Sequence, residues 1–153
     1  MKFNFHYLQQ SNLEEELVLL PMAVEADEQW SFVQSKRNQR WLWCVLGHRT
    51  HEVIAYAFGS RTHAVLSRLL TLLSPLKMTH WFTDGLKTYH ELLDQTKHFT
   101  GKRNTQKIER FFLTLRTRIK RLTRRTICFS KSIIMHDTVI ALFINRYYFG
   151  QNV

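Results

Sequence analysis

The chain has 153 residues, of which 44% are hydrophobic and 13% aromatic, so it can fold around a core and does not have the composition of a disordered protein. No apolar run reaches the roughly 18 residues that a membrane-spanning helix needs, and the N-terminus lacks a signal peptide's apolar stretch and cleavage site. The two cysteines, Cys44 and Cys128, are isolated, which is typical of a reducing compartment and excludes a cysteine-built zinc site within this chain.

After a lead-in of residues 1–22, the first half of the chain has the pattern of consecutive strands. Three segments rich in β-branched and aromatic residues predict these strands: Val24–Val33, Arg40–Leu46 and Val53–Phe58. The polar stretches 34–39 and 47–52 separate them and predict short antiparallel connections.

Helices and strands alternate in the rest of the chain. Apolar periodicity and turn signals predict four helices, at Thr62–Ser74, Thr88–Gln95, Thr105–Leu122 and Ser132–Tyr148, and two strands, at Met78–Thr83 and Lys97–Thr100. Thr105 is expected to cap the long helix with its side chain. Three antiparallel strands followed by two crossover strands predict one α/β domain over residues 23–153, with helices on the faces of a mixed sheet.

The formal net charge of +10 is concentrated in one segment. Residues 101–131 hold eleven basic side chains and one acid, Glu109, whereas the remainder of the chain has eleven of each sign. The basic residues of the segment are Lys102, Arg103, Lys107, Arg110, Arg116, Arg118, Lys120, Arg121, Arg124, Arg125 and Lys131. Such a stripe favours binding to a polyanion, of which nucleic acid is the common case, although a solvated helix face is an alternative interpretation.

Three acids stand where they suit metal-ion chemistry. Asp27 lies inside the first strand, Asp84 follows the strand at 78–83, and Glu109 lies near the start of the long helix. Carboxylate oxygens are hard ligands that suit magnesium or manganese, and a set of them can hold two ions roughly 4 Å apart on a phosphodiester. Each acid also has a purely structural interpretation. Asp27 would be a buried hydrogen-bonded acid, Asp84 a turn former, and Glu109 a charge favoured by the dipole at the start of the helix. Glu28 is expected to point to the opposite face of the strand and to stay away from the same metal.

Several short fragments, in order, are more specific than any single motif. They are D-E-Q-W-S-F-V at 27–33, F-G-S-R-T at 58–62, L-S-P at 73–75, T-D-G at 83–85, Q-K-I-E-R at 106–110, L-R at 115–116 and C-F-S-K-S at 128–132. Together they resemble the transposases of the insertion-sequence-one (IS-one) family, and the resemblance covers about residues 24–148. That family has a triad of Asp, Asp and Glu with 24 residues between the last two, which is the number between Asp84 and Glu109.

The resemblance implies a ribonuclease-H-like fold and the metal-dependent chemistry of DDE transposases, which cleave DNA at the element's ends and transfer the strand into target DNA. It implies that Asp27, Asp84 and Glu109 are the catalytic residues and the ligands of two Mg²⁺ (or Mn²⁺) ions. Arg116 corresponds to a DNA-contacting basic residue of such enzymes. Further basic residues of the same segment are expected to bind DNA: Lys107, Arg110, Lys120, Arg124 and Arg125.

The sequence departs from the family pattern at two points. Phe112 stands where members commonly have a polar residue, often Asn, and the chain has no cysteine set for the family's N-terminal zinc finger and helix-turn-helix. The resemblance therefore implies the catalytic part alone, acting as a homo-oligomer on DNA with an upstream reading-frame product, in a prokaryotic cytoplasm near the nucleoid. Two alternatives stay open: a DNA-binding remnant that regulates transposition without cleavage, and a general ribonuclease-H-like nuclease.

Overall fold

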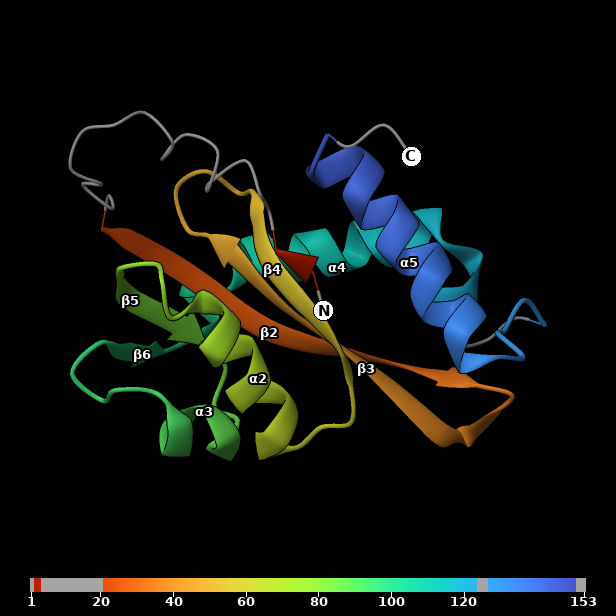
Figure 1. Ribbon diagram of the computed structural model, residues 1–153, viewed down its shortest axis with the longest axis horizontal. Coiled ribbons are helices and arrows are strands. Elements are labelled where there is room, and N and C mark those ends of the chain that lie inside the picture. The colour runs from red at the N-terminus through yellow and green to blue at the C-terminus, as the bar shows by residue number, and fades with distance from the viewer. Residues whose placement is uncertain (1, 4–20, 124–126, 151–153) are drawn as a thin grey trace.

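The computed structural model describes residues 2–3, 21–123 and 127–150, and it shows a sheet covered by helices (Figure 1). The strands are β1 (Lys2–Phe3), β2 (Met22–Val33), β3 (Ser35–Gly47), β4 (Val53–Gly59), β5 (Met78–Thr83) and β6 (His98–Thr100). They form a six-stranded sheet in the order β1-β4-β3-β2-β5-β6. Neighbours β2, β3 and β4 are antiparallel, whereas β5 is parallel to β2 and β6 to β5. The predicted mixed α/β sheet is confirmed, and β1, from the lead-in, adds an antiparallel edge strand that was not predicted.

The turn between β2 and β3 is much tighter than the sequence suggested. We expected residues 34–39 to form a polar connection, but β3 already begins at Ser35, and the chain reverses at Gln34, whose φ is 65°. Residues 35–39 are exposed at the far end of the hairpin. Their polarity therefore reflects strands that face water on both sides rather than a loop.

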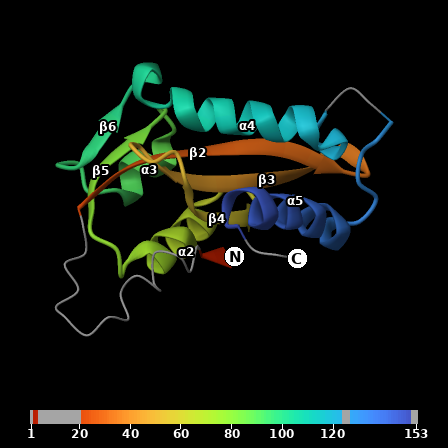
Figure 2. The ribbon, with the colours of Figure 1, turned by 90° about the horizontal axis from the view of Figure 1, so that it is seen from above.

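The helices cover both faces of the sheet, as its alternating strand residues require. They are α2 (His63–Leu73), α3 (Lys87–Leu92), α4 (Gln106–Arg118) and α5 (Ile133–Tyr148). Trp43 and Val45 of β3 pack with α2 and α3, whereas Leu42 and Cys44, on the other face of the same strand, pack with α4 and α5. Figure 2 shows α4 and α2 on opposite sides of the sheet.

Helix α4 is shorter than its apolar stripe predicted. It ends at Arg118 because Ile119 takes an extended backbone conformation, and a 3₁₀ turn, Lys120–Leu122, follows. Ile119 and Leu122 are nevertheless buried in the same apolar cluster as α4. The apolar spacing therefore predicted which residues are buried, but it overestimated the length of the helix. No helix in the part of the chain that the structure describes is long and apolar enough to cross a membrane.

Candidate active site

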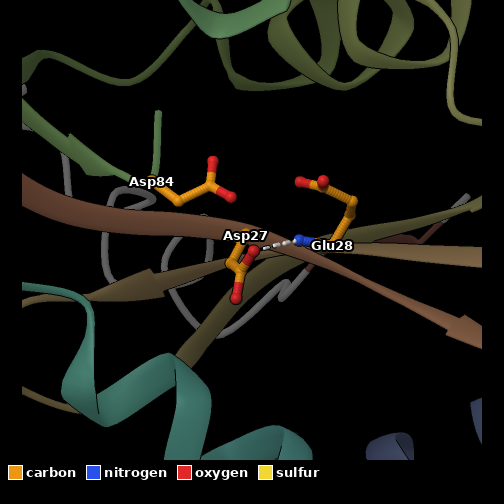
Figure 3. A group of neighbouring side chains, drawn as sticks. All are labelled: Asp27, Glu28 and Asp84. Atoms are coloured by element: carbon orange, nitrogen blue, oxygen red, sulfur yellow. Dashed lines mark hydrogen bonds between the residues drawn. The ribbon is translucent and has the colours of Figure 1, made fainter. Parts of the chain in front are cut away.

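The parallel pairing of β2 and β5 places Asp27 and Asp84 at the same level of the sheet. Glu25 of β2 pairs with Phe82 of β5, so the residues two positions further along each strand lie side by side. One carboxylate oxygen from each of Asp27, Glu28 and Asp84 lies within 4.8 Å of the others (Figure 3). The structure thus brings together two of the three acids that the sequence singled out, at the carboxyl end of β5, where ligand crevices of α/β sheets form.

Glu28 is the acid that we expected to point to the opposite face of the strand and to stay away from the same metal. Its side chain leaves β2 on the side opposite to Asp27, as alternation predicts, yet its carboxylate belongs to the same close group (Figure 3). Arg61 donates from Nε and Nη2 to Glu28 Oε1 at 2.9 and 2.6 Å, and Tyr89 Oη donates to Oε2 at 3.0 Å. Burial raises the pKa of Glu28, the hydrogen bonds from Arg61 lower it, and the charge of Asp84 raises it again.

The carboxyl group of Asp27 is largely buried and lies near other acids, which raises its pKa. Its pKa is raised from 3.8 to about 7, mainly by burial and with contributions from the charges of Glu28, Asp84 and Glu109. A hydrogen bond from the backbone N–H of Glu28, at 2.8 Å, acts in the opposite direction. An acid in such surroundings gains from a neighbouring positive charge. The donor set consists of carboxylate oxygens, and among the described residues no basic side chain forms an ion pair with Asp27, so these residues fit a hard divalent cation such as Mg²⁺ or Mn²⁺.

Glu109 lies in the first turn of α4 and is exposed. Its charge raises the pKa of Asp27, but its carboxylate is not part of the group within 4.8 Å. Thr105 does not cap α4 as expected, because its hydroxyl lies 3.3 Å from Glu109 Oε1 instead of accepting from a backbone N–H of the first turn.

A buried acid on β2 replaces that cap. Glu25 is 1% exposed, and its Oε2 accepts from the backbone N–H of Ile108, in the first turn of α4, at 3.1 Å. Its Oε1 lies 2.7 Å from His48 Nδ1 and 4.0 Å from Lys107 Nζ. Glu25 therefore ties the start of α4, one residue before Glu109, to the strand that carries Asp27. The two-residue spacing of Glu25 and Asp27, which puts both on one face of a strand, was the signal that could have revealed it.

The predicted DNA-binding residues have different surroundings. Arg110 and Lys120 are exposed, and Arg116 is half-buried. Lys107 points inward, because its ammonium donates to the carbonyl of His48 beside Glu25. Lys107 thus contributes to holding the start of α4, and its contact with DNA stays a prediction. Arg124 and Arg125 lie outside the described residues.

Phe112, the departure from the family pattern, is a core residue. It is 4% exposed, its ring centre lies 5.5 Å from that of Phe111, and it belongs to the apolar cluster between the sheet, α4 and α5. The position therefore supplies packing and no polar group.

Comparison with known proteins places most of the chain in one family. A family model described as IS1 transposase matches residues 20–150. Over 130 residues the chain is 48% identical to the insertion element iso-IS1n protein InsB of Shigella dysenteriae, which covers 85% of this chain and 99% of that protein. It is 44% identical over 124 residues to the insertion element IS1 4 protein InsB of Escherichia coli K12, covering 81% of this chain and 74% of that one.

The fold is also found in a solved structure. A chain in the cryoEM structure of a simian T-cell lymphotropic virus intasome in complex with the PP2A regulatory subunit B56 gamma matches 83% of this chain with a TM-score of 0.52. The match is 16% identical and spans about half, 48%, of that chain, so it shows the fold alone. With the mixed sheet described above, it confirms the predicted ribonuclease-H-like fold. The family model and the InsB relatives show that the chain belongs to the IS1 transposase family.

Proposed function

We propose that residues 23–153 form the DDE catalytic domain of a DNA transposase, which cleaves DNA at the ends of an insertion element and joins the freed strand to target DNA. The observation that carries this proposal is the closeness of Asp27, on β2, to Asp84, directly after the neighbouring parallel strand β5. Glu25 ties the start of α4, which bears Glu109, to the same strand β2. This arrangement occurs in a chain whose family is that of IS1 transposases.

Asp27, Asp84 and Glu109 would hold the divalent ions, two of which are expected. When bound, such ions activate the attacking oxygen and stabilise the leaving oxygen of a phosphodiester. Glu28 is held by Arg61 and Tyr89, so it adds negative charge beside Asp27 while its own oxygens are already hydrogen-bonded. Glu25 fixes the start of α4 and with it the position of Glu109.

The substrate is DNA, and the exposed cations of α4 support this choice. Arg110 and Lys120 are exposed and Arg116 is half-buried, so their charges are available to neutralise the phosphates that the acids repel. We further propose that the chain assembles as a homo-oligomer on DNA, together with an upstream zinc-finger and helix-turn-helix product that recognises the element's ends.

Cleavage of labelled element-end DNA tests this function. The purified chain, alone and with the end-binding product added, is incubated with Mg²⁺ or Mn²⁺, and Asp84→Asn is compared with Asp94→Asn, a substitution of an exposed acid away from the site. We expect cleavage by the wild type and by Asp94→Asn and at least a hundredfold loss in Asp84→Asn. Cleavage that survives in Asp84→Asn contradicts the assigned site, and equal cutting of unrelated DNA indicates a general nuclease instead.

A second candidate function is regulation by a DNA-binding protein that no longer cleaves. The observation that favours it is the buried ring of Phe112, at a position where the resemblance to the family implies a polar side chain. It predicts salt-sensitive binding to element ends without cleavage under either metal, even when the end-binding product is present.

A further inference from the structure

A hollow of about 490 Å³ lies between the end of α4 and α5, apart from the acidic site. Arg118 contributes to its wall and lies nine residues after Glu109 on α4, which is about 14 Å along the helix axis. The α5 side of the hollow carries Leu142, Phe143 and Tyr147 and one cation, Arg146. The predicted metal ligands Asp27, Asp84 and Glu109 do not line this hollow.

Four cations surround this apolar surface, and no acid does: Arg118, Lys120, Arg121 and Arg146. In the described part of the chain, none of the four forms an ion pair, although Arg121 Nη1 lies 3.4 Å from the hydroxyl of Ser130. Their repulsion is therefore not compensated within the fold, and a polyanion in the hollow would relieve it.

The hollow also exposes aromatic rings to water. Phe143 and Tyr147, one turn apart on α5, have ring centres 4.6 Å apart, and Tyr147 is 59% exposed. The guanidinium of Arg146 lies 5.9 Å from the Tyr147 ring centre. An exposed ring beside unpaired cations is the arrangement on which nucleic-acid bases stack while phosphates contact the cations.

The ligand must therefore combine repeated negative charge with flat apolar faces. Nucleic acid does so, but a duplex hides the faces of its bases in its own stack, whereas an unpaired strand offers them. We propose that this hollow binds a DNA strand whose bases are unpaired. The choice of DNA rests on the proposed function, whereas the preference for an unpaired strand rests on the exposed rings.

Binding in the absence of metal tests this site apart from cleavage. Fluorescence anisotropy in EDTA measures the affinity of the full chain for a labelled oligo-dT of twelve nucleotides and for a hairpin duplex. The double variant Arg118→Gln/Arg146→Gln is compared with Lys36→Gln/Arg37→Gln, which removes two exposed charges from the β2–β3 hairpin. We expect at least a tenfold loss for oligo-dT in the first variant, a salt slope smaller by about 1.4, and less than a threefold loss in the second.

Tyr147→Ala isolates the stacking contribution. We expect a loss of about five- to tenfold for oligo-dT and less than twofold for the duplex, in the range measured for one stacked base. Equal binding of duplex and single strand, no effect of Tyr147→Ala, or equal losses in the two charge variants would each overturn the proposal. So would size-exclusion data showing that Tyr147→Ala breaks a contact between copies and leaves DNA binding intact. A wild type that binds oligo-dT through this hollow but never cleaves contradicts the proposed function and leaves this inference standing.

Discussion

Glu28 is buried next to two other acids, and only a few side chains keep it there. Glu28 accepts three hydrogen bonds from side chains, two from Arg61 and one, at 3.0 Å, from Tyr89, which is 1% exposed. Tyr89→Phe keeps the ring in the core and removes that donor from a buried charged acceptor. We expect the free energy of unfolding in urea to fall by about 1.5–3 kcal/mol. Tyr147→Phe, at an exposed position, is the control and is expected to change it by less than about 0.5 kcal/mol. An unchanged midpoint for Tyr89→Phe would show that Arg61 alone satisfies Glu28.

His136 gives the fold a defined dependence on pH. The ring lies between two hydroxyls, with Nε2 2.8 Å from Ser31 Oγ and Nδ1 2.8 Å from Ser130 Oγ, and burial lowers its pKa. In the unfolded chain, His136 takes up a proton near pH 6.5, whereas in the folded chain it does so only at lower pH. Its contribution to the free energy of unfolding is therefore fully present above pH 6.5 and is lost as the pH falls.

The measurement compares urea unfolding of the wild type and His136→Asn at pH 7.5, 6.5 and 5.5. The stability lost by the substitution should shrink as the pH falls, because the wild type must bury an imidazole that prefers to be charged. Asp27 and Glu28, whose pKa values are raised, act in the opposite direction, so the difference between the two proteins is the quantity to follow. A constant difference across this pH range contradicts the lowered pKa of His136.

At the scale of the elements, the start of α4 is held by a side chain from a distant strand. Glu25 accepts from the backbone N–H of Ile108, and Lys107 and His48 surround the same carboxylate. Glu25→Gln is expected to lower the free energy of unfolding by about 1.5–3 kcal/mol, the range for a hydrogen bond to a charged group. Hydrogen exchange of residues 106–109 should become faster than that of the rest of α4.

Glu91→Gln is the matched control for this substitution. Glu91 forms ion pairs with His63 and Lys87 at an exposed position, where water screens the charges, so loss of these pairs is expected to leave the urea midpoint almost unchanged. If Glu25→Gln speeds exchange uniformly over the molecule, Glu25 supports the core in general and does not hold α4 in particular.

The order and type of the predicted elements were correct because strand and helix periodicities in this chain are strong. Val53–Phe58 and Met78–Thr83 match β4 and β5 to within one residue. Two predictions were wrong because they rested on polar residues. Residues 34–39 were predicted to be a loop, but β3 begins at Ser35. Thr105 was expected to cap α4, but Glu25 of a distant strand accepts from the first turn instead.

The positions of site residues were predictable where strand order determines them. They were not predictable where they depend on the positions of side-chain ends. Asp27 and Asp84 could be paired from strand order, whereas the convergence of Glu28 with them depends on the ends of side chains that alternation alone does not describe. The partners of Glu28, Arg61 and Tyr89, come from different elements, and no spacing in the sequence connects them.

At the scale of the whole molecule, occupancy of the acidic site should be linked to global stability. A divalent ion that binds only the folded chain stabilises it, by about 2.7 kcal/mol at a hundredfold excess over its dissociation constant. Because burial raises the pKa of Asp27 to about 7, protons compete for this carboxylate, and the effect should be larger at pH 8 than at pH 6. Thermal unfolding in Mg²⁺ and in EDTA measures it. Asp27→Asn should remove the metal-dependent shift and Asp94→Asn should keep it; an equal shift in both variants would place the ion elsewhere.

Both edges of the sheet end in very short strands, and this has a consequence for how the protein behaves in concentrated solution. In the part of the chain that the structure describes, β1 consists of Lys2 and Phe3, which pair with Tyr56 and Ala55 of β4, and β6 is three residues long. Short edge strands offer few backbone groups to a passing chain, so they resist edge-to-edge aggregation. Behind β1 lies β4, Val53–Gly59, an uncharged run of β-branched, aromatic and small residues of the kind that stacks into fibrils. Deletion of residues 1–3 should therefore increase light scattering at high protein concentration, and a Lys substituted at Phe58 in the same deletion should reduce it again.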